Sequence, residues 1–194
     1  MLFDATQFDR LVRAWVLAHQ SHGIYLVFYW ISAVCSVTPM EGYGAIGALL
    51  LWRRGRWQSA SIVLLAPAAA VVTYLGIKRL VGRPRPSLAG LLEGTSSFPS
   101  AHATTSAAVC LTLAYVFRKE GEIGGTSAAV LGIVVPLLVG ASRVYLDLHW
   151  TTDVLGGWAA GLLIALGIAL LGGVVDRLSS GGPRQNSSHL KPNA

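Results

Sequence analysis

The chain has 194 residues, a length suited to one compact domain, and its composition is unusual for a soluble protein. Hydrophobic residues make up 53% of it and charged residues only 12%, whereas a typical globular chain is about 25% charged. Many apolar side chains must therefore face lipid. The net charge of +6 comes from short basic clusters between apolar runs, a pattern that indicates membrane topology and anion binding and excludes a nucleic-acid-binding face.

The N-terminal segment, residues 1–21, predicts an amphipathic helix lying at the membrane interface. Its apolar residues, among them Leu11, Trp15 and Val16, recur at roughly helical spacing. The alternative is a partly ordered tail. No apolar core follows the charged residues of this segment, so the sequence does not predict a cleavable signal peptide.

Six apolar stretches follow, and each predicts a transmembrane helix, for which about 20 residues suffice. The second stretch is the shortest and gives the weakest signal. The polar C-terminal segment, rich in Ser, Gly and Pro, is typical of a disordered tail. We therefore predict an all-α integral membrane protein with one domain over residues 1–178 and a disordered tail over 179–194. The six predicted spans are 23–38, 42–52, 59–77, 103–117, 127–144 and 152–175.

Basic residues in the short loops predict the orientation, because Lys and Arg are enriched on the cytoplasmic side. With six spans, both termini and the loops at 53–56 and 118–119 fall on one face, which is then cytoplasmic. The opposite, extracytoplasmic face receives five of the 15 basic residues, so another role must hold them there. These five are Lys78, Arg79, Arg83, Arg85 and Arg143.

Three stretches with catalytic types of residue meet on that extracytoplasmic face: 78–86, 98–102 and 142–153. Enzymes neutralise a phosphoryl group with basic side chains and backbone N–H donors. Lys78, Arg85 and Arg143 supply the charge. Ser100 and the amides that begin the following helix add hydrogen bonds, because a helix N-terminus binds anions. The pattern predicts a phosphate site at the membrane boundary.

Two histidines in these stretches can divide the chemistry of phosphoryl transfer. One can attack phosphorus while the other protonates the leaving oxygen. His149 and Asp153 are four residues apart, so they share one face at the start of a helix. A carboxylate there can hold one ring nitrogen of the imidazole and leave the other nitrogen to attack.

The three stretches together resemble the signature of the type 2 phosphatidic acid phosphatase superfamily: K-x6-R-P at 78–86, P-S-x-H at 99–102 and S-R-x5-H-x3-D at 142–153. The resemblance covers roughly residues 59–175. One position departs from the common pattern: Ala101 stands where most members have Gly, which narrows the room beside the phosphate.

The resemblance implies a lipid phosphate or diphosphate phosphatase that forms a phosphohistidine. It implies His149 as the nucleophile, Asp153 as its orienting partner and His102 as the general acid. A phosphate cradle and an outward-facing site are also implied, with no metal and no other cofactor. The implied cradle consists of Lys78, Arg85, Ser100, Arg143 and the amide of Ala101. The expected partners are a lipid substrate and the bilayer, and the sequence does not indicate an oligomeric state.

Alternatives remain open at this point. Arg83 either extends the positive field toward a second phosphate or is a solvated loop charge, and the latter is favoured. Asp147 is interpreted as a salt-bridge or loop residue, and Trp150 as an interfacial anchor or a substrate contact. A lipid phosphotransferase, a haloperoxidase with the same anion cradle and a non-enzymatic polytopic membrane protein are the rival functions. The sequence favours a phosphatase acting on undecaprenyl diphosphate, phosphatidylglycerophosphate, phosphatidic acid or a related lipid.

Overall fold

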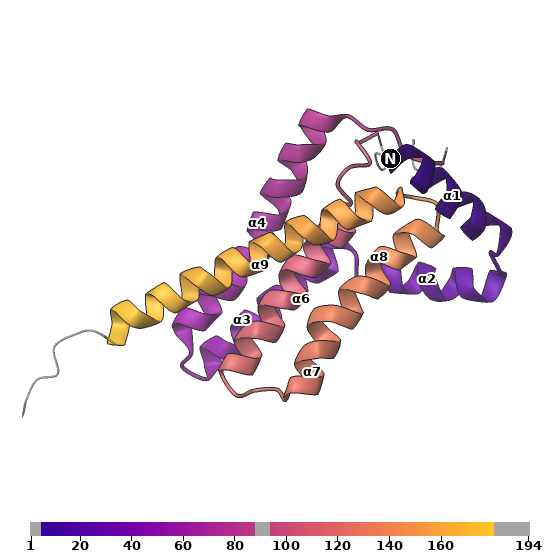
Figure 1. Cartoon of the computed structure of the whole chain (residues 1–194). Coiled ribbons are helices and arrows are strands. Elements are labelled where there is room, and N and C mark those ends of the chain that lie inside the picture. The colour runs from indigo at the N-terminus through magenta and orange to yellow at the C-terminus, as the bar shows by residue number, and fades with distance from the viewer. Residues whose placement is uncertain (1–4, 88–93, 181–194) are drawn as a thin grey trace, which may run out of the picture.

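The computed structural model describes residues 5–87 and 94–180, and the regular elements within these ranges are all helical. The helices form an elongated bundle (Figure 1). The predicted tail, 179–194, falls almost entirely outside the described residues. The helices are α1 (Ala5–Ala18), α2 (His22–Val34), α3 (Val37–Arg53), α4 (Trp57–Val81), α6 (Ala101–Lys119), α7 (Gly125–Ala129), the π-helical turn η1 (Val130–Val134), α8 (Val135–Tyr145) and α9 (Thr151–Ser180).

Helix α6 is the centre of the bundle and packs against α3, α4, α8 and α9. Small residues bring α9 into close contact with it. A Cβ atom on Gly157 would lie 2.8 Å from the Cβ of Ala103, and one on Gly161 would lie 2.7 Å from the carbonyl oxygen of Thr104. Glycines at this four-residue spacing let two helix backbones approach. The approach fixes the start of α9 beside the start of α6.

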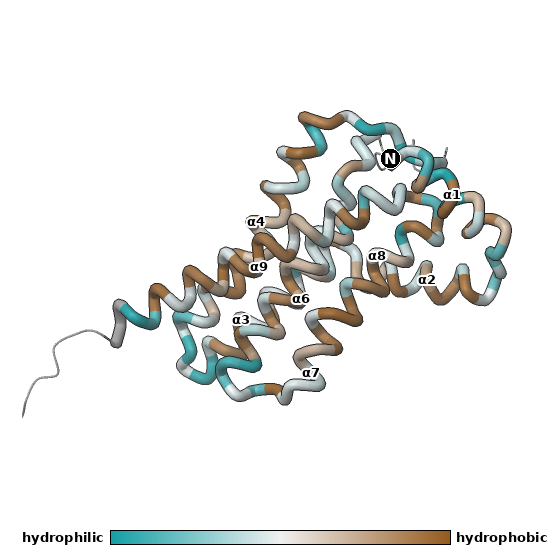
Figure 2. The backbone as a smooth tube through the Cα atoms, in the orientation of Figure 1, coloured by the Kyte–Doolittle hydropathy of each residue, from teal (hydrophilic) through white to brown (hydrophobic). Residues whose placement is uncertain are grey.

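Many large apolar side chains of the bundle are exposed, and hydrophilic residues gather at its two ends (Figure 2). On α9, for example, Leu163 is 69% exposed and Leu170 is 73% exposed. A soluble protein rarely presents so continuous an apolar surface. The bundle therefore has the surface of a membrane protein.

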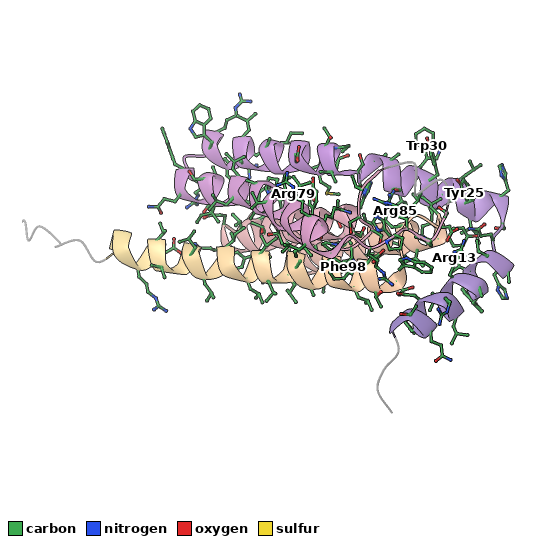
Figure 3. All side chains as sticks on the ribbon, turned by 90° about the horizontal axis from the view of Figure 1, so that it is seen from above. Arg13, Tyr25, Trp30, Arg79, Arg85 and Phe98 are labelled. Carbon is green, nitrogen blue, oxygen red and sulfur yellow. The ribbon has the colours of Figure 1, made fainter. Side chains whose placement is uncertain are left out.

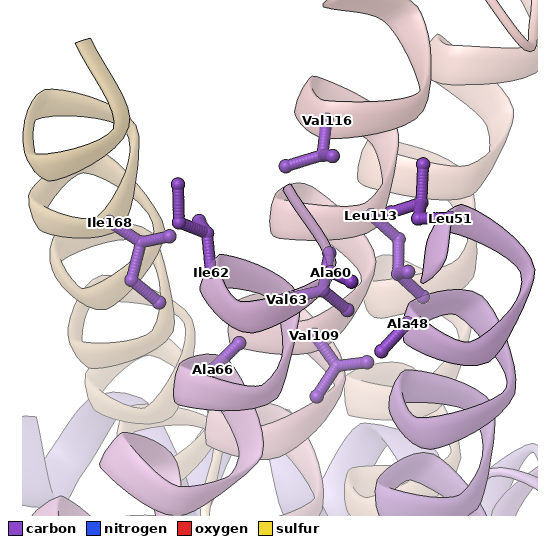
Figure 4. Close-up of a cluster of buried hydrophobic side chains, with 10 residues drawn as sticks. All are labelled: Ala48, Leu51, Ala60, Ile62, Val63, Ala66, Val109, Leu113, Val116 and Ile168. Atoms are coloured by element: carbon purple, nitrogen blue, oxygen red, sulfur yellow. The ribbon is translucent and has the colours of Figure 1, made fainter. Parts of the chain in front are cut away.

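Inside the bundle, a cluster of buried apolar side chains packs between α3, α4, α6 and α9 (Figure 4). Leu51 and Val63 are each 1% exposed, and Val109 of α6 packs with them. In a bilayer, such buried side chains stabilise the bundle by van der Waals packing between the helices rather than by leaving water.

Three helical units within the described ranges are long and apolar enough to cross a membrane: α4, the unit α7–α8 and α9. The pair α2 and α3 makes a fourth if it counts as one bent span. Helix α6 has 19 residues, about 28 Å at 1.5 Å per residue, but Thr104, Thr105 and Thr112 reduce its hydropathy. The neighbouring helices bury these side chains, so α6 needs no lipid-facing apolar surface.

The structure does not confirm the prediction of two separate spans at 23–38 and 42–52. Helices α2 and α3 are bent by 52° at their junction and continue in the same general direction along the bundle (Figures 1 and 3). A helical hairpin would reverse the chain here. The apolar run is instead broken around Cys35 and Ser36, which separate the two helices. The count of six separate spans is therefore not confirmed.

The missing reversal also places α1 and the last turns of α9 at opposite ends of the bundle (Figure 1). We call the two ends the α1 end, with the loop residues 82–87, 94–100 and 146–150, and the α7 end, with the loops at 54–56 and 120–124. Arg13 of α1 pairs with Asp147 at the α1 end, while Asp176 of α9 pairs with Lys119 at the α7 end. The prediction that both termini share one face is therefore not confirmed.

Candidate active site

The site lies at the α1 end, where four helices start or stop. Helix α4 ends at Gly82, whose positive φ of 62° suits a glycine cap. Two hydrogen bonds from backbone amides then hold the following loop. The amide of Ser97 donates to the carbonyl of Arg83 at 2.8 Å, and the amide of Arg83 donates to Ser96 Oγ at 3.0 Å. Lys78, on the last turn of α4, donates through Nζ to the carbonyl of Ser96. The loop thereby holds Lys78 and Arg85 on one side of the site.

The Arg85 guanidinium is buried at the centre of the site, 7% exposed. Its Nη1 donates to the carbonyl of Leu148 and lies 3.0 Å from Nε2 of His149. Its Nη2 donates to Thr95 Oγ1 at 3.2 Å. Figure 3 labels Arg85 and Phe98 toward the α1 end of the bundle. The predicted cradle residue therefore touches the predicted nucleophile directly.

The N-terminus of α6 supplies the predicted anion site of Ser100, Ala101 and His102. Ser100 is the N-cap, fully buried, and its Oγ accepts from the amide of Ala103. Its own amide donates to the carbonyl of Asp153 at 3.0 Å. Ala101 begins the helix and His102 lies in the first turn. The positive end of the helix thus adjoins the start of α9.

Arg143 reaches the site from the last turn of α8 and is 5% exposed. Its Nη1 donates to Ser32 Oγ of α2 at 2.7 Å. Its charge lowers the pKa of both site histidines, which places it within electrostatic reach of them. Sequence reasoning did not single out Ser32, a polar residue within an otherwise apolar stretch.

His149 and Asp153 form the predicted pair. Nδ1 of His149 lies 3.4 Å from Oδ2 of Asp153, and both residues are buried. Because Arg85 has only N–H donors, its contact with Nε2 requires a lone pair there, so the proton lies on Nδ1. The same carboxylate oxygen accepts from the amide of Trp150 at 2.9 Å. Nε2 therefore carries the lone pair and faces the cradle.

Both site histidines are held neutral, and both lie outside the predicted spans. Burial, and then the charges of Arg143 and Arg85, lower the pKa of His149 to about 4, although Asp153 opposes the shift. Burial and the charges of Arg143, His149, Arg85 and Lys78 lower the pKa of His102 to about 2. The excess of positive charge that disfavours the imidazolium forms favours a bound anion. The site is thus built for a multiply charged ligand.

Sequence reasoning misjudged Arg83 and missed Asp9. Arg83 is not a solvated loop charge: Nη1 donates to Oδ1 of Asp153 at 2.7 Å, and Nη2 donates to Oδ2 of Asp9 at 2.7 Å. Asp9 lies on α1 and is 1% exposed. The available signal was an acidic residue on the helix face that also carries buried Val16.

The interpretation of Asp147 as a salt-bridge residue is confirmed. Arg13 of α1 donates through Nε to Oδ1 of Asp147 at 2.7 Å and through Nη2 to Oδ2 at 2.8 Å. Asp147 has a positive φ of 56°, a conformation that Asp and Asn adopt more readily than most residues. Trp150 donates through Nε1 to the carbonyl of Pro84 at 2.9 Å. Trp150 thereby joins the loop before α9 to the loop after α4.

Within residues 5–87 and 94–180, no three His, Cys, Asp or Glu side chains gather as a metal site. Asp9, His149 and Asp153 are near one another, but Arg83 separates the two carboxylates. Metal independence stays a prediction.

Comparison with known proteins agrees with this geometry. The model of the PAP2 superfamily matches residues 59–174, more than half of the chain. The chain belongs to the PAP2 superfamily. The matched region includes α6, α8 and most of α4 and α9. It also includes all the predicted site residues. Helices α1, α2 and α3 lie outside it.

Several relatives of this PAP2 chain carry names of lipid phosphatases. It is 35% identical over 61% of its length to the phosphatidylglycerophosphatase B of Bacillus subtilis, of which the match covers 60%. It is also 35% identical over 73% of its length to a decaprenylphosphoryl-5-phosphoribose phosphatase of Mycobacterium tuberculosis, 71% of which is covered. An undecaprenyl-diphosphatase of Bacillus subtilis is 32% identical over 62% of the chain and 63% of its own length.

The fold is also that of a solved PAP2 protein. The crystal structure of a transmembrane PAP2-type phosphatidylglycerolphosphate phosphatase from Bacillus subtilis superposes with a TM-score of 0.77 at 27% identity. The superposition covers 90% of each chain, so the likeness extends beyond the matched region to the N-terminal helices. The chain is a transmembrane, all-helical member of the superfamily.

Proposed function

We propose that this protein is a membrane lipid phosphatase that hydrolyses a phosphomonoester or diphosphate through a phosphohistidine at His149. One observation carries the proposal: Nδ1 of His149 faces Asp153, while Nε2 carries its lone pair into a buried group of cations. A neutral imidazole held by a carboxylate is an activated nucleophile. The names of the relatives support a lipid as the substrate.

In the first step, Nε2 of His149 attacks phosphorus and the bond from phosphorus to the lipid oxygen breaks. The bonding electrons go to that oxygen, which takes a proton through His102. Because His102 is neutral in the empty site, this proton arrives with the phosphate. Lys78, Arg85 and Arg143 neutralise the equatorial oxygens, and the amide of Ala101 at the start of α6 adds a hydrogen bond. Asp153 stabilises the positive charge that develops on His149.

In the second step, water attacks the phosphohistidine while His102 takes its proton. The bond between phosphorus and Nε2 breaks, and its electrons return to His149. Inorganic phosphate leaves, and the net change is hydrolysis of one ester or anhydride bond. Arg85 must move off Nε2 when the phosphate arrives, because the same guanidinium Nη1 contacts Nε2 in the empty site. Substrate binding therefore exposes the nucleophile.

The proposal is tested by phosphate release from a panel of purified lipids in detergent: phosphatidylglycerophosphate, phosphatidic acid and undecaprenyl diphosphate. His149→Ala should release no phosphate and trap no phosphoenzyme, while its melting temperature in detergent shows that it folds. Substantial turnover by a folded His149→Ala protein would sink the assignment. Transfer of phosphate to a second lipid instead of to water would make the chain a phosphotransferase.

The proposal includes five crossings of the membrane: the bent pair α2–α3, then α4, α6, α7–α8 and α9. The site and α1 are then extracytoplasmic and the α7 end is cytoplasmic. In the described residues the α1 end holds seven Lys or Arg and the α7 end holds six. Subtracting Lys78, Arg85 and Arg143, which we assign to phosphate, leaves four against six and favours this orientation.

Cysteine labelling on intact cells tests the orientation. In a background of Cys35→Ser and Cys110→Ser, single cysteines at Arg10 and Ser87 should react with a membrane-impermeant thiol reagent. A cysteine at Thr126, which is exposed at the α7 end, should react only after the cells are opened. Labelling at Ser87 but not at Arg10 would restore a sixth crossing between α1 and the site. The reverse pattern, with Thr126 labelled alone, would place the site in the cytoplasm.

A further inference from the structure

The buried carboxylate of Asp9 has no role in the mechanism above. It belongs to α1, outside the region that matches the superfamily, and only 1% of it is exposed. Burying a charge is costly unless partners compensate it. Asp9 accepts three hydrogen bonds: from the amide of Thr152 at 2.9 Å, from its hydroxyl at 2.5 Å and from Nη2 of Arg83 at 2.7 Å.

These bonds connect Asp9 to the catalytic pair. Arg83 uses Nη2 for Asp9 and Nη1 for Oδ1 of Asp153, each at 2.7 Å. Oδ2, the other oxygen of Asp153, faces Nδ1 of His149. Asp9, Arg83, Asp153 and His149 therefore form one continuous chain of polar contacts. The two carboxylates of this chain and the imidazole are at most 3% exposed.

We infer that Asp9 and Arg83 are positioning residues for the catalytic pair of Asp153 and His149. The inference rests on the proposed function. The guanidinium fixes Oδ1 of Asp153, so the plane of the carboxylate is set and Oδ2 points at His149. A planar, two-armed donor is required, since Lys has one point charge and cannot hold two carboxylates in a fixed plane.

Asp9 has an electrostatic role beside its geometric one. Arg83 alone would neutralise Asp153 and weaken its stabilisation of the positive charge that develops on His149. Asp9 supplies a second negative charge to the same guanidinium, so the three groups together keep a net charge of −1 beside the imidazole. Such an interaction grows in the transition state and raises kcat rather than substrate affinity.

The N-terminal helix thereby contributes to the active site from about 140 residues away in sequence. Its second anchor is the ion pair of Arg13 with Asp147, which includes neither Asp153 nor His149. This second anchor provides a matched control, since breaking it loosens α1 without changing the carboxylates around Arg83.

The test compares Asp9→Asn with Asp147→Asn in the full-length protein in detergent. Asparagine keeps the shape of each side chain and tolerates the positive φ of residue 147. Asp9→Asn should lower kcat by about tenfold or more and leave KM within about twofold, because the phosphate cradle is unchanged. Asp147→Asn should leave both within about twofold. Equal loss of kcat in the two variants, or no loss in Asp9→Asn, would overturn the inference.

Two further measurements separate positioning from simple docking of α1. Arg83→Lys should lose about as much kcat as Asp9→Asn, and the double variant should lose little more, since residues of one network are not additive. Losses that multiply in the double variant would contradict the chain of contacts.

Orthovanadate binding, measured by calorimetry, needs no turnover. It should weaken about fivefold or more in Asp9→Asn and stay unchanged in Asp147→Asn, because the anion resembles the transition state. Unchanged vanadate affinity in Asp9→Asn would also reject the inference. If the wild-type protein releases phosphate from no lipid, the proposed function fails. The measurement of vanadate binding still decides the role of Asp9.

Discussion

The two ends of the bundle contain similar ion pairs and use them differently. At the α1 end, Arg83 joins Asp9 and Asp153, which are 1% and 0% exposed. At the α7 end, the side chains of Arg54 and Glu122 are 55% and 21% exposed. Exposed pairs contribute about 0–1 kcal/mol, whereas leaving one buried partner unpaired costs roughly 3–5 kcal/mol.

The difference shows that burial, not residue type, distinguishes the ion pairs of the two ends. The charges at the α7 end remain in contact with water and headgroups, so each can be lost cheaply. At the α1 end, the carboxylates of Asp9 and Asp153 are buried and share Arg83, so each depends on its partners. Four experiments can break or sharpen this comparison, and they are ordered by expected effect.

The largest effect is expected at Asp153. Asp153→Asn removes the charge that orients and stabilises His149 and leaves Arg83 facing a neutral amide. By analogy with a triad carboxylate, kcat should fall about 10³–10⁴-fold. The same change at the α7 end, Asp176→Asn, should leave kcat within about twofold. Phosphate release by both variants measures kcat, and their melting temperatures show whether they fold. A comparable loss in Asp176→Asn would abolish the distinction between the two ends.

The second prediction concerns pH. Because kcat/KM reports the free enzyme and burial lowers the pKa of His149 to about 4, the nucleophile stays neutral through weakly acidic solution. It gains a proton, and loses its lone pair, only as the pH falls through about 4. The acid limb of kcat/KM should therefore lie near pH 4, about two units below that of an ordinary histidine.

The alkaline limb of the same profile should follow the substrate. His102 is neutral in the empty site, its pKa lowered to about 2, so the proton for the leaving group must arrive with the phosphate. The second pKa of a phosphomonoester is about 6, and kcat/KM should decline above it. Assays over the full range, each followed by a return to neutral pH to exclude unfolding, measure both limbs. An acid limb near pH 6.5 would show that the site is wetter than the burial of His149 implies.

Much of the site could be predicted from the sequence, because its chemistry lies in short motifs at helix ends. Four predicted site residues lie at or near a helix end, so the predicted spans were enough to bring them to one end of the bundle. These four are Lys78, Arg85, Ser100 and Arg143. His149 and Asp153 needed only the four-residue period of a helix. Their roles, as distinct from their positions, remain predictions.

The features that the sequence did not predict depend on contacts between residues far apart in the chain. A span count treats each apolar run as a crossing and cannot see that α2 and α3 continue in one direction, because a bend of 52° leaves no signal in hydropathy. The same count separated Arg13 from Asp147, which the structure pairs. Asp9 was missed for the same reason: its partners, Arg83 and Thr152, lie 74 and 143 residues away, and no local pattern joins them.

The third prediction concerns glycines of α9. A Cβ atom on Gly157 would lie 2.8 Å from the Cβ of Ala103 and 2.9 Å from the carbonyl oxygen of Ser100, and neither atom belongs to a flexible side-chain end. Gly157→Ala should therefore force α9 away from α6 at a cost of about 1–3 kcal/mol, and kcat should fall as Ser100 moves. A Cβ on Gly173 meets nothing within 4 Å, so Gly173→Ala should raise stability by up to about 1 kcal/mol. Melting temperatures in detergent that change in the same direction would contradict this account.

The smallest effect is expected from Glu122→Gln at the α7 end. Glu122 pairs with Arg54, but more than half of the arginine side chain is exposed, so water and headgroups replace the lost partner. The free energy of unfolding should change by less than about 1 kcal/mol, and the difference from wild type should shrink in salt as screening weakens the pair. Asp9→Asn also replaces a carboxylate by an amide, but at a buried position. It should lower the free energy of unfolding several times more and show little salt dependence, because salt screens buried pairs much less than exposed ones. Melting temperatures of both variants at low and high ionic strength give the comparison directly. Equal, salt-sensitive losses would mean that the Asp9 network is solvated, and the two ends of the bundle would then differ only in the residues that touch phosphate.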